Sequence, residues 1–231
     1  VLSIVITSPT FGKSMFQESL ERLRFYGPFA FAIMSAHILF HKIMAGIHSL
    51  IPLVKPHSVS NVIQKHQIPK HHPPSLNSKE FCDYVSGNDT DIIISIAATE
   101  IFKKAILDSP KRGCINYHMA DLPKYRGRQP LFWALFHSEQ EVGISVHEMI
   151  EKLDGGPIIA KTFFSVPSTR SLHDLYLKTI KKGPEVLIDA VEKIDSGCED
   201  RILNNDSDAT VFRFPTPNEA RRFRKQGNTF F

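Results

Sequence analysis

Asp91-Ile-Ile-Ile-Ser-Ile-Ala97 is a nearly continuous run of apolar residues near the middle of the 231-residue chain. A strand with one face in water alternates apolar and polar residues, whereas a strand of a parallel sheet that helices cover on both faces reads as such a run. The segment therefore predicts a buried parallel strand. Gly113–Tyr117 predicts a second strand further along the chain.

Helical and extended patterns alternate around these two strands. Strands that alternate with helices indicate an α/β fold, here with a mostly parallel twisted sheet flanked by helices. We expect a main domain over residues 1–203 and a short C-terminal appendage over residues 204–231, because the polar run Asn204–Ala209 separates them. The other patterns predict helices over Ser58–His66, Asn77–Val85, Phe102–Leu107, Leu131–His137 and Ser168–Ser196, and strands over Val1–Thr7, Pro69–His72, Gly143–Met149 and Pro157–Val166.

The N-terminal part of the chain has two helical patterns, Lys13–Tyr26 and Phe29–Ile47. Apolar residues lie on more than one side of the second helix, so we expect it to be buried on more than one face. Polar residues interrupt it and no run of about 18 apolar residues exists, so no transmembrane segment is expected. An interfacial membrane helix stays open as an alternative. The interrupting residues are His37, His41, Lys42 and His48.

The composition is that of an ordinary globular protein, with 42% hydrophobic and 23% charged residues, which excludes a disordered or collagen-like chain. Three widely spaced cysteines exclude a disulfide framework and favour a reducing, cytoplasmic compartment. The net charge is 28 − 24 = +4. The segment Arg213–Lys225 accounts for this excess, and we interpret it as a solvated terminal helix, with nucleic-acid contact as the less favoured alternative.

Polar side chains follow the second predicted strand, where open α/β sheets bind ligands. Asn116 and His118 are two positions apart, so their side chains share one face of the strand. Asp154 lies in a predicted loop beside two glycines. An amide and a protonated imidazole can stabilise the oxyanion that forms when an amine attacks a carbonyl carbon, and a carboxylate can help to manage the proton. The trio therefore suits acyl-type transfer.

Three blocks around these residues resemble the signature of the folate-dependent formyltransferases. They agree in order and spacing, the His118-to-Asp154 interval is 154 − 118 = 36 residues, and the resemblance covers roughly Ser58 to Val166. It implies the Rossmann-like fold of that family. The family's first strand has no clear counterpart, because Val1–Ser8 is more similar to the second strand. The blocks are Asn116-Tyr-His-Met-Ala-Asp-Leu-Pro-Lys-Tyr-Arg-Gly-Arg-Gln-Pro-Leu-Phe-Trp133, Gly143-Ile-Ser-Val-His-Glu-Met149 and Lys152-Leu-Asp-Gly-Gly-Pro-Ile-Ile159.

The resemblance implies an enzyme that transfers a formyl group from 10-formyltetrahydrofolate to a primary amine of a small acceptor, with a nucleotide-linked amino sugar as the candidate. It assigns catalysis to Asn116, His118 and Asp154. Asp121 departs from the family pattern, and Arg126 and Arg128 are equally compatible with acceptor phosphate binding and with salt bridges inside the loop. The implied folate-binding residues are Ala98, Thr99, Glu100, Ile101, Phe102, Ile150 and Leu153, and the implied acceptor-binding residues are Asp121, Arg126 and Arg128.

Other interpretations stay open. A hydrolase would release formate from the same donor without an amine, and a truncated homologue without a first strand would be non-catalytic. The opening Val1-Leu-Ser-Ile suggests missing upstream sequence, and the chain ends too soon for the large C-terminal domain of methionyl-tRNA formyltransferases, which makes a nucleic-acid acceptor less favoured. No metal site is expected, because the His37 and His41 pair lacks a third ligand. His147 is expected to be a packed strand residue and Trp133 a core residue.

Overall fold

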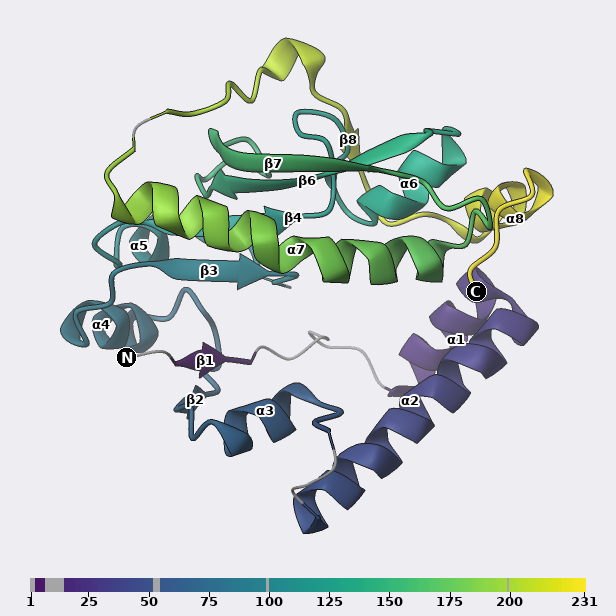
Figure 1. Cartoon of the computed structure of the whole chain (residues 1–231), viewed down its shortest axis with the longest axis horizontal. Coiled ribbons are helices and arrows are strands. Elements are labelled where there is room, and N and C mark those ends of the chain that lie inside the picture. Colours follow the sequence, from purple (N-terminus) through teal and green to yellow (C-terminus); the bar gives the residue numbers. More distant parts are fainter. Residues whose placement is uncertain (1–2, 7–14, 52–54, 99, 199) are drawn as a thin grey trace. The chain divides into compact units, whose positions relative to one another are not determined.

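The computed structural model describes residues 3–6, 15–51, 55–98, 100–198 and 200–231, and it forms two compact units, Val1–Pro74 and Ser75–Phe231 (Figure 1). The predicted boundary between residues 203 and 204 lies inside the second unit. Whether residues 204–231 fold separately from the main domain stays a prediction.

The second unit is built on a four-stranded sheet with the order β3-β4-β6-β7. β3 and β4 are parallel, whereas β4, β6 and β7 pair in antiparallel fashion. A separate parallel pair joins β5 to β8, and a third parallel pair joins β1 (Ile4–Val5) to β2 (Lys70–His71) in the first unit, so three of the five pairings between described strands are parallel. This confirms the α/β class and adds an antiparallel hairpin to the sheet. The strands are β3 (Ile93–Ile96), β4 (Cys114–His118), β5 (Arg126–Gly127), β6 (Glu141–Glu148), β7 (Ile158–Ser165) and β8 (Val211–Phe212).

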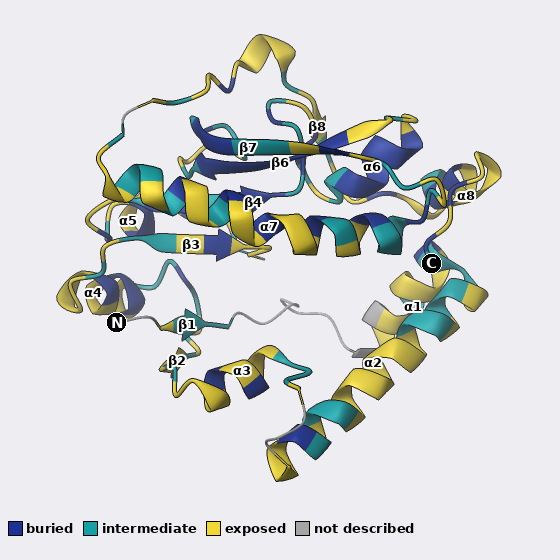
Figure 2. Ribbon diagram, in the orientation of Figure 1, coloured by how far each residue is buried: buried dark blue, intermediate teal, exposed yellow. Residues whose placement is uncertain are grey.

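Helices cover the sheet because their apolar faces need burial. Every residue from Leu131 to Phe136 of α6 is buried, including Trp133, so the predicted core role of the tryptophan is confirmed (Figure 2). The long helix α7 is amphipathic, and Ser171 caps its N-terminus, because the Ser171 side chain accepts a hydrogen bond from the Asp174 N–H. The pattern Ser168–Ser196 favoured Ser168 or Thr169 as the cap, which is wrong by two or three residues. The helices of this part are α4 (Lys79–Gly87), α5 (Lys104–Leu107), α6 (Pro130–Phe136) and α7 (Leu172–Asp195).

The C-terminal segment packs back onto the same core. Phe223 of α8 (Pro217–Lys225) is fully buried and stacks on Phe132 of α6, with ring centroids 4.6 Å apart. The Trp133 Nε1–H donates to the carbonyl of Arg213 at 3.0 Å. A short 3-10 turn, η1 (Asp206–Asp208), and β8 precede this helix. Residues 204–231 are therefore an integral part of the packing of the second unit.

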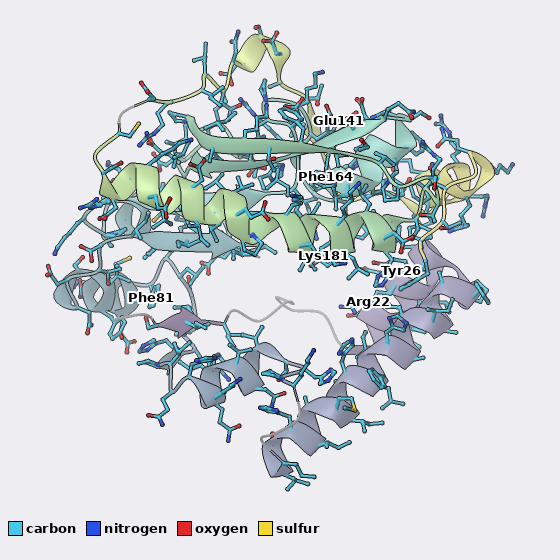
Figure 3. The ribbon with its side chains drawn as sticks, in the orientation of Figure 1. Arg22, Tyr26, Phe81, Glu141, Phe164 and Lys181 are labelled. Atoms are coloured by element: carbon cyan, nitrogen blue, oxygen red, sulfur yellow. The ribbon has the colours of Figure 1, made fainter. Side chains whose placement is uncertain are left out.

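Among the residues that the structure describes, the first unit contains a parallel pair of short strands and three helices. Burial raises the pKa of Tyr26, against the opposing effect of Arg22 one turn earlier (Figure 3). Residues 1, 2 and 7 of the predicted strand Val1–Thr7 lie outside the described residues, and β1 lies among the other four. The elements are β1 (Ile4–Val5), α1 (Met15–Tyr26), α2 (Pro28–Leu50), α3 (Val59–Lys65) and β2 (Lys70–His71).

The prediction that the apolar helix is buried on more than one face is wrong for α2. His48 is its only residue classed as buried among those described, and Phe29 is 80% exposed. The helix is long and apolar enough to cross a membrane by length and composition, with a mean hydropathy of 1.5 over its most apolar stretch. A single helix of this kind argues only weakly for a span. The expected lack of a transmembrane segment therefore stays a prediction.

Candidate active site

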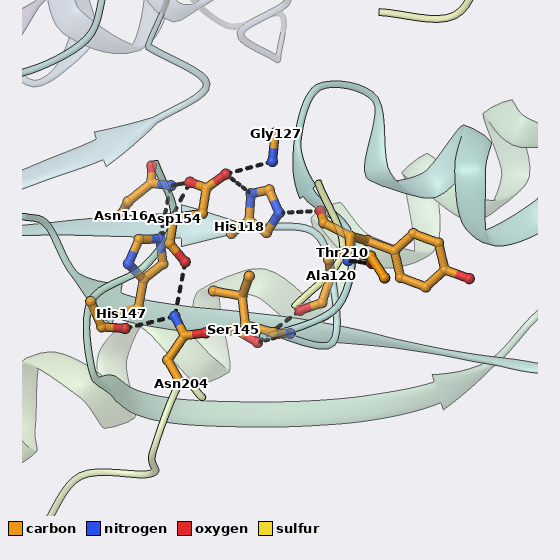
Figure 4. A network of polar contacts seen from close by, with 12 residues as sticks. Asn116, His118, Ala120, Gly127, Ser145, His147, Asp154, Asn204 and Thr210 are labelled. Carbon is orange, nitrogen blue, oxygen red and sulfur yellow. Dashed lines mark hydrogen bonds and ion pairs between the residues drawn. The ribbon is translucent and has the colours of Figure 1, made fainter. Parts of the chain in front are cut away.

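The sheet brings the three predicted catalytic side chains together. Asn116 and His118 project from the same face of β4, and Asp154 reaches them from the β6–β7 loop (Figure 4). The Asn116 Nδ2 lies 3.4 Å from the Asp154 Oδ1, and the His118 Nδ1 lies 3.8 Å from the Asp154 Oδ2. Asn116 and His118 share a face of β4 because side chains alternate along a strand.

Backbone geometry aims the Asp154 carboxylate at this face. Its φ of 46° is in the left-handed region, where a residue with a Cβ is strained by about 1–2 kcal/mol. The Gly127 N–H donates to the Asp154 Oδ2 at 2.7 Å. Close packing supports the same loop, since a Cβ on Gly156 would collide with the carbonyl of Glu148. Residues outside the β6–β7 loop, Gly127 and Glu148, therefore help to fix its conformation.

His147 is a fourth member of this cluster and was not predicted as a site residue. It pairs directly with Asn116 across β4 and β6, and its Nε2 lies 3.3 Å from the Asn116 Nδ2 and 3.6 Å from the Asp154 Oδ1. His147 belongs to the Gly143–Met149 block that resembles the formyltransferase signature. Its contact with Asn116 depends on the register between β4 and β6, which the sequence does not show. The carboxylate therefore contacts two imidazoles.

Backbone carbonyls fix both imidazole rings. The His118 Nε2 lies 2.9 Å from the carbonyl of Tyr125, and the His147 Nδ1 lies 2.7 Å from the carbonyl of Glu148. A carbonyl only accepts, so these two nitrogens carry hydrogen. The remaining nitrogen of each ring faces Asp154. Each ring can therefore take up a proton on the side where the carboxylate stabilises the resulting charge.

Burial and charge act on this cluster in opposite directions. Burial lowers the pKa of His118 below its usual value, with a smaller lowering from His147, and outweighs the favourable effects of Asp154 and the Tyr125 carbonyl. For Asp154, burial alone would raise the pKa, but the contacts with His147, His118 and the Gly127 N–H together hold it below its usual value. A neutral His118 thus faces an ionised Asp154 near neutral pH, so this pair can accept a proton.

The predicted folate-binding residues lie in two loops. Ile96 pairs with Tyr117, so the 98–102 loop begins beside the end of β4 that carries His118. Ile101 is 70% exposed, whereas Phe102 is buried and Glu100 bonds inside the protein, to Ser75, Asn77 and the N–H of Leu76. Thr99 lies outside the described residues. Ala98 follows β3, and the β6–β7 loop exposes Ile150 and Leu153.

The predicted acceptor-binding residues are mostly engaged within the protein. Asp121 forms an ion pair with Lys161 and borders a small cavity of about 40 Å³. Arg126 is 2% exposed, so its geometry supports the loop-stabilising alternative. Arg128 lies over the Phe214 ring, with 5.1 Å between the guanidinium carbon and the centroid. No interaction joins these three residues to the Asn116 cluster directly in the described structure.

The buried carboxylate of Asp154 contacts two histidines and an amide beside the carboxyl end of a parallel strand, which is the edge where open α/β sheets bind ligands. Among the residues that the structure describes, no group of three or more His, Cys, Asp or Glu side chains is arranged to hold a metal ion.

Comparison with known proteins defines the family. The model of the formyl transferase family matches residues 48–191, which is more than half of the chain. The chain belongs to this family. It is 33% identical over 144 residues to the methionyl-tRNA formyltransferase of Thermotoga maritima, covering 62% of this chain and 46% of that one. The corresponding enzyme of Protochlamydia amoebophila is 30% identical over 162 residues, covering 70% and 50%. The chain thus spans about half the length of these curated relatives.

Solved structures share the fold. The N-formyltransferase of Helicobacter canadensis, in complex with folinic acid and dTDP-3-aminofucose, superposes with a TM-score of 0.55 at 20% identity, covering 67% of this chain and 54% of that one. Glycinamide ribonucleotide transformylase 1 of Symbiobacterium toebii gives a TM-score of 0.56 at 17% identity, covering 62% and 70%. These matches confirm the predicted formyltransferase fold.

Proposed function

We propose that this chain transfers a formyl group from 10-formyltetrahydrofolate to a primary amine of a small acceptor, with a nucleotide-linked amino sugar as the candidate. The observation that carries the proposal is the buried cluster of Asn116, His118 and Asp154 in a member of the formyl transferase family. The structurally similar H. canadensis enzyme was crystallised with a folate and a nucleotide-linked amino sugar, which supports both choices.

The folate donor supplies an activated formyl group. In the proposed reaction, the amide of Asn116 donates a hydrogen bond to the formyl oxygen as negative charge develops there. The amine nitrogen forms a bond to the formyl carbon and loses a proton, which the Asp154–His118 pair takes up as an imidazolium beside the carboxylate, and this imidazolium stabilises the same charge. The bond from the formyl carbon to the folate nitrogen then breaks, the proton passes to that nitrogen, and tetrahydrofolate leaves. Only interactions that strengthen as charge develops lower the barrier, so these three groups act on kcat.

We assign the donor to the neighbourhood of the two loops that expose apolar side chains. Ile101, Ile150 and Leu153 fit this role, because exposed apolar side chains suit the flat ring system of a folate. The backbone of Ala98 and of residues 100–102 provides polar groups near the end of β3. Glu100 belongs to the proposal only as the residue that holds this loop, since its carboxylate bonds to residues 75–77.

The similar proteins differ in the acceptor that their names or ligands indicate. Methionyl-tRNA formyltransferases are named for a tRNA acceptor, whereas the structurally similar H. canadensis enzyme was crystallised with dTDP-3-aminofucose, and we propose a small amine as the acceptor. Asp121 and Arg128 are the proposed contacts, and Arg126 supports the loop between them. A cytoplasmic location is part of the proposal, because the cysteines Cys82, Cys114 and Cys198 are free thiols.

The test combines donor binding with a product assay on the full chain. Calorimetry with 5-formyltetrahydrofolate should show saturable binding, and tetrahydrofolate should form only when an amino-sugar nucleotide is added. Formate release without an amine would identify a hydrolase, and transfer to methionyl-tRNA alone would overturn the small acceptor. A chain that neither binds folate nor turns it over would be a non-catalytic homologue.

A further inference from the structure

The segment 204–212 contacts both loops that support the candidate site, and we call it the clasp. It follows α7 and ends with β8, far in sequence from the residues that it holds. Asn204 begins the clasp and is 7% exposed. The Asn204 Nδ2 donates to the carbonyls of Asp154 and Gly156, each at 2.8 Å (Figure 4).

These two bonds hold a strained conformation. Asp154 has a left-handed backbone, which persists only where surrounding contacts enforce it. Asn204 satisfies the carbonyl of Asp154 itself and that of Gly156 two residues later. Loss of its amide would leave two carbonyls without this donor and would release the loop toward an ordinary backbone conformation.

The same side chain reaches the loop that fixes His118. The Asn204 Oδ1 accepts a hydrogen bond from the Arg126 guanidinium at 2.7 Å, and Arg126 also bonds to Asp206 at 2.9 Å. Arg126 stands between Tyr125, whose carbonyl receives the His118 Nε2–H, and Gly127, whose N–H binds the Asp154 carboxylate. Asn204 thus joins the support of His118 to that of Asp154.

The far end of the clasp pins this loop in register. The N–H of Arg126 donates to the carbonyl of Thr210 and the N–H of Tyr125 to the Thr210 Oγ1, both at 2.8 Å. Gly127 has a φ of 93° and packs so closely against β8 that a Cβ would collide with the carbonyl of Phe212. The loop therefore cannot shift without breaking contacts at both ends of the clasp.

We propose that Asn204 is a positioning residue for the reaction, which aligns Asp154 with His118 by bonding the Asp154 backbone and Arg126 at once. This inference rests on the proposed function. Asn204 touches neither reacting side chain through its own polar atoms. It acts through the two loops, so its removal should impair the chemical step more than the binding of donor or acceptor.

Asn228 provides a matched control. It is also a buried asparagine of the C-terminal segment, it also bonds to an arginine (Arg170 Nε to Asn228 Oδ1, 2.8 Å), and its amide also donates to a backbone carbonyl, that of Leu135. None of these contacts involves the cluster around Asp154. Asn228→Ala should therefore lose similar local bonding and leave the active-site geometry intact.

The experiment compares full-length wild type, Asn204→Ala, Asn204→Asp and Asn228→Ala. Asn204→Asp keeps an oxygen for Arg126 but has no N–H for the two carbonyls. Its side chain has nearly the same size as that of Asn204, so it serves as the test variant if Asn204→Ala does not fold. Both Asn204 variants should lose about 10- to 100-fold in kcat, with both KM values within about 2-fold of wild type. Their His118 imidazole, followed by NMR titration, should titrate at higher pH as the site hydrates.

The two readouts separate the outcomes. Wild-type kcat and wild-type His118 titration in folded Asn204 variants would overturn the inference, as would an equal loss of kcat in Asn228→Ala. If wild type transfers no formyl group to any amine, the proposed function fails. The His118 titration then decides the positioning role alone, with a shift in the Asn204 variants and none in Asn228→Ala as the supporting result.

Discussion

At the scale of single residues, Asp154 is where structure and chemistry are most closely joined. Asparagine at this position has nearly the same shape and retains an oxygen for the Gly127 N–H, but it cannot stabilise an imidazolium or accept a proton. We expect Asp154→Asn to lower kcat by about 10²- to 10⁴-fold. Its free energy of unfolding should change far less, because the backbone contacts of the loop remain.

The measurement is steady-state kinetics beside urea unfolding. Asp189→Asn is a suitable control, since that carboxylate pairs with Lys193 on the surface of α7 and has no contact with the cluster. Parallel losses of activity and stability in Asp154→Asn would show that the carboxylate only maintains the fold.

His118 should make stability depend on pH. Its pKa in the folded chain is lowered, so between that value and about 6.5 the unfolded chain binds more protons, and the free energy of unfolding rises with pH. Asp154 also has a lowered pKa, but its contribution is complete above about 3.9 and is lost only as pH falls through its folded pKa. The free energy of unfolding, measured with urea between about pH 5 and 7.5, should therefore rise with pH in the wild type. The rise should be smaller in His118→Gln. An unchanged slope in that variant would contradict the prediction.

The residue scale also shows where sequence reasoning ends. Asn116 and His118 were predictable because alternation along one strand is a local rule. His147 and Asn204 were not, because their neighbours depend on strand register and on a segment 50 residues beyond Asp154. A carboxylate beside an imidazole favours its protonated form, and Asp154 acts on the pKa of His118 in that direction, yet burial, which the sequence does not reveal, outweighs it.

Among the elements, helix α7 packs against the site-bearing strand through a glycine. A Cβ on Gly183 would lie 2.6 Å from the Tyr117 hydroxyl, which donates to the carbonyl of Thr179 at 3.0 Å. Alanine favours a helix by up to about 1 kcal/mol over glycine. Here we expect Gly183→Ala to destabilise by about 1–3 kcal/mol, because a well-packed interior must shift to admit it.

Gly87 of α4 is the control for this prediction, since nothing lies within 4 Å of the Cβ that alanine would add there. Chemical denaturation of Gly87→Ala should show equal or greater stability than wild type. A stabilised Gly183→Ala would mean that Tyr117 and α7 adjust to each other without strain.

The start of α8 depends on a reciprocal cap. The Thr216 side chain accepts from the N–H of Glu219, and the Glu219 carboxylate accepts from the N–H of Thr216 and pairs with Arg213. The hydrogen bond from Arg213 is the largest of the effects that lower the pKa of Glu219 to about 2. Glu219→Gln should destabilise by about 1 kcal/mol at neutral pH. The difference from wild type should hold above about 4.3 and shrink as pH falls toward 2, which acid-range denaturation curves would check.

Element boundaries show which local signals are sufficient. The apolar run 91–97 predicted the strand β3, but the expected burial on both faces is wrong, because Ile94 and Ile96 are 38% and 58% exposed. The pattern 168–196 predicted α7, because amphipathicity is read directly from residue order. β5 and β8 have two residues each and exist through their pairing with each other, so no periodicity could reveal them. For α2, an apolar composition predicted burial, but composition does not specify a partner surface.

At the scale of the whole molecule, the predicted boundary at residue 203 asks whether residues 204–231 fold separately or together with the rest of the second unit. The buried ring of Phe223 stacks on Phe132 and lies 5.1 Å from Phe230, so the segment contributes to the core of the second unit. Truncation of a fully buried phenylalanine to alanine typically costs about 3–5 kcal/mol. A loss of this size is a large share of the stability of an ordinary domain.

We therefore expect Phe223→Ala to lower the free energy of unfolding by about 3–5 kcal/mol and to lower activity in proportion to the folded fraction. Phe214→Ala, which removes a partly exposed ring of the same segment, should cost much less. Urea unfolding followed by tryptophan fluorescence is a direct measurement, because Trp133 bonds to the C-terminal segment through the carbonyl of Arg213. A shortened chain, residues 1–203, should lose the cooperative transition. If it instead unfolds with the wild-type midpoint, the predicted boundary at residue 203 is the correct division and the C-terminal contacts are peripheral to the fold.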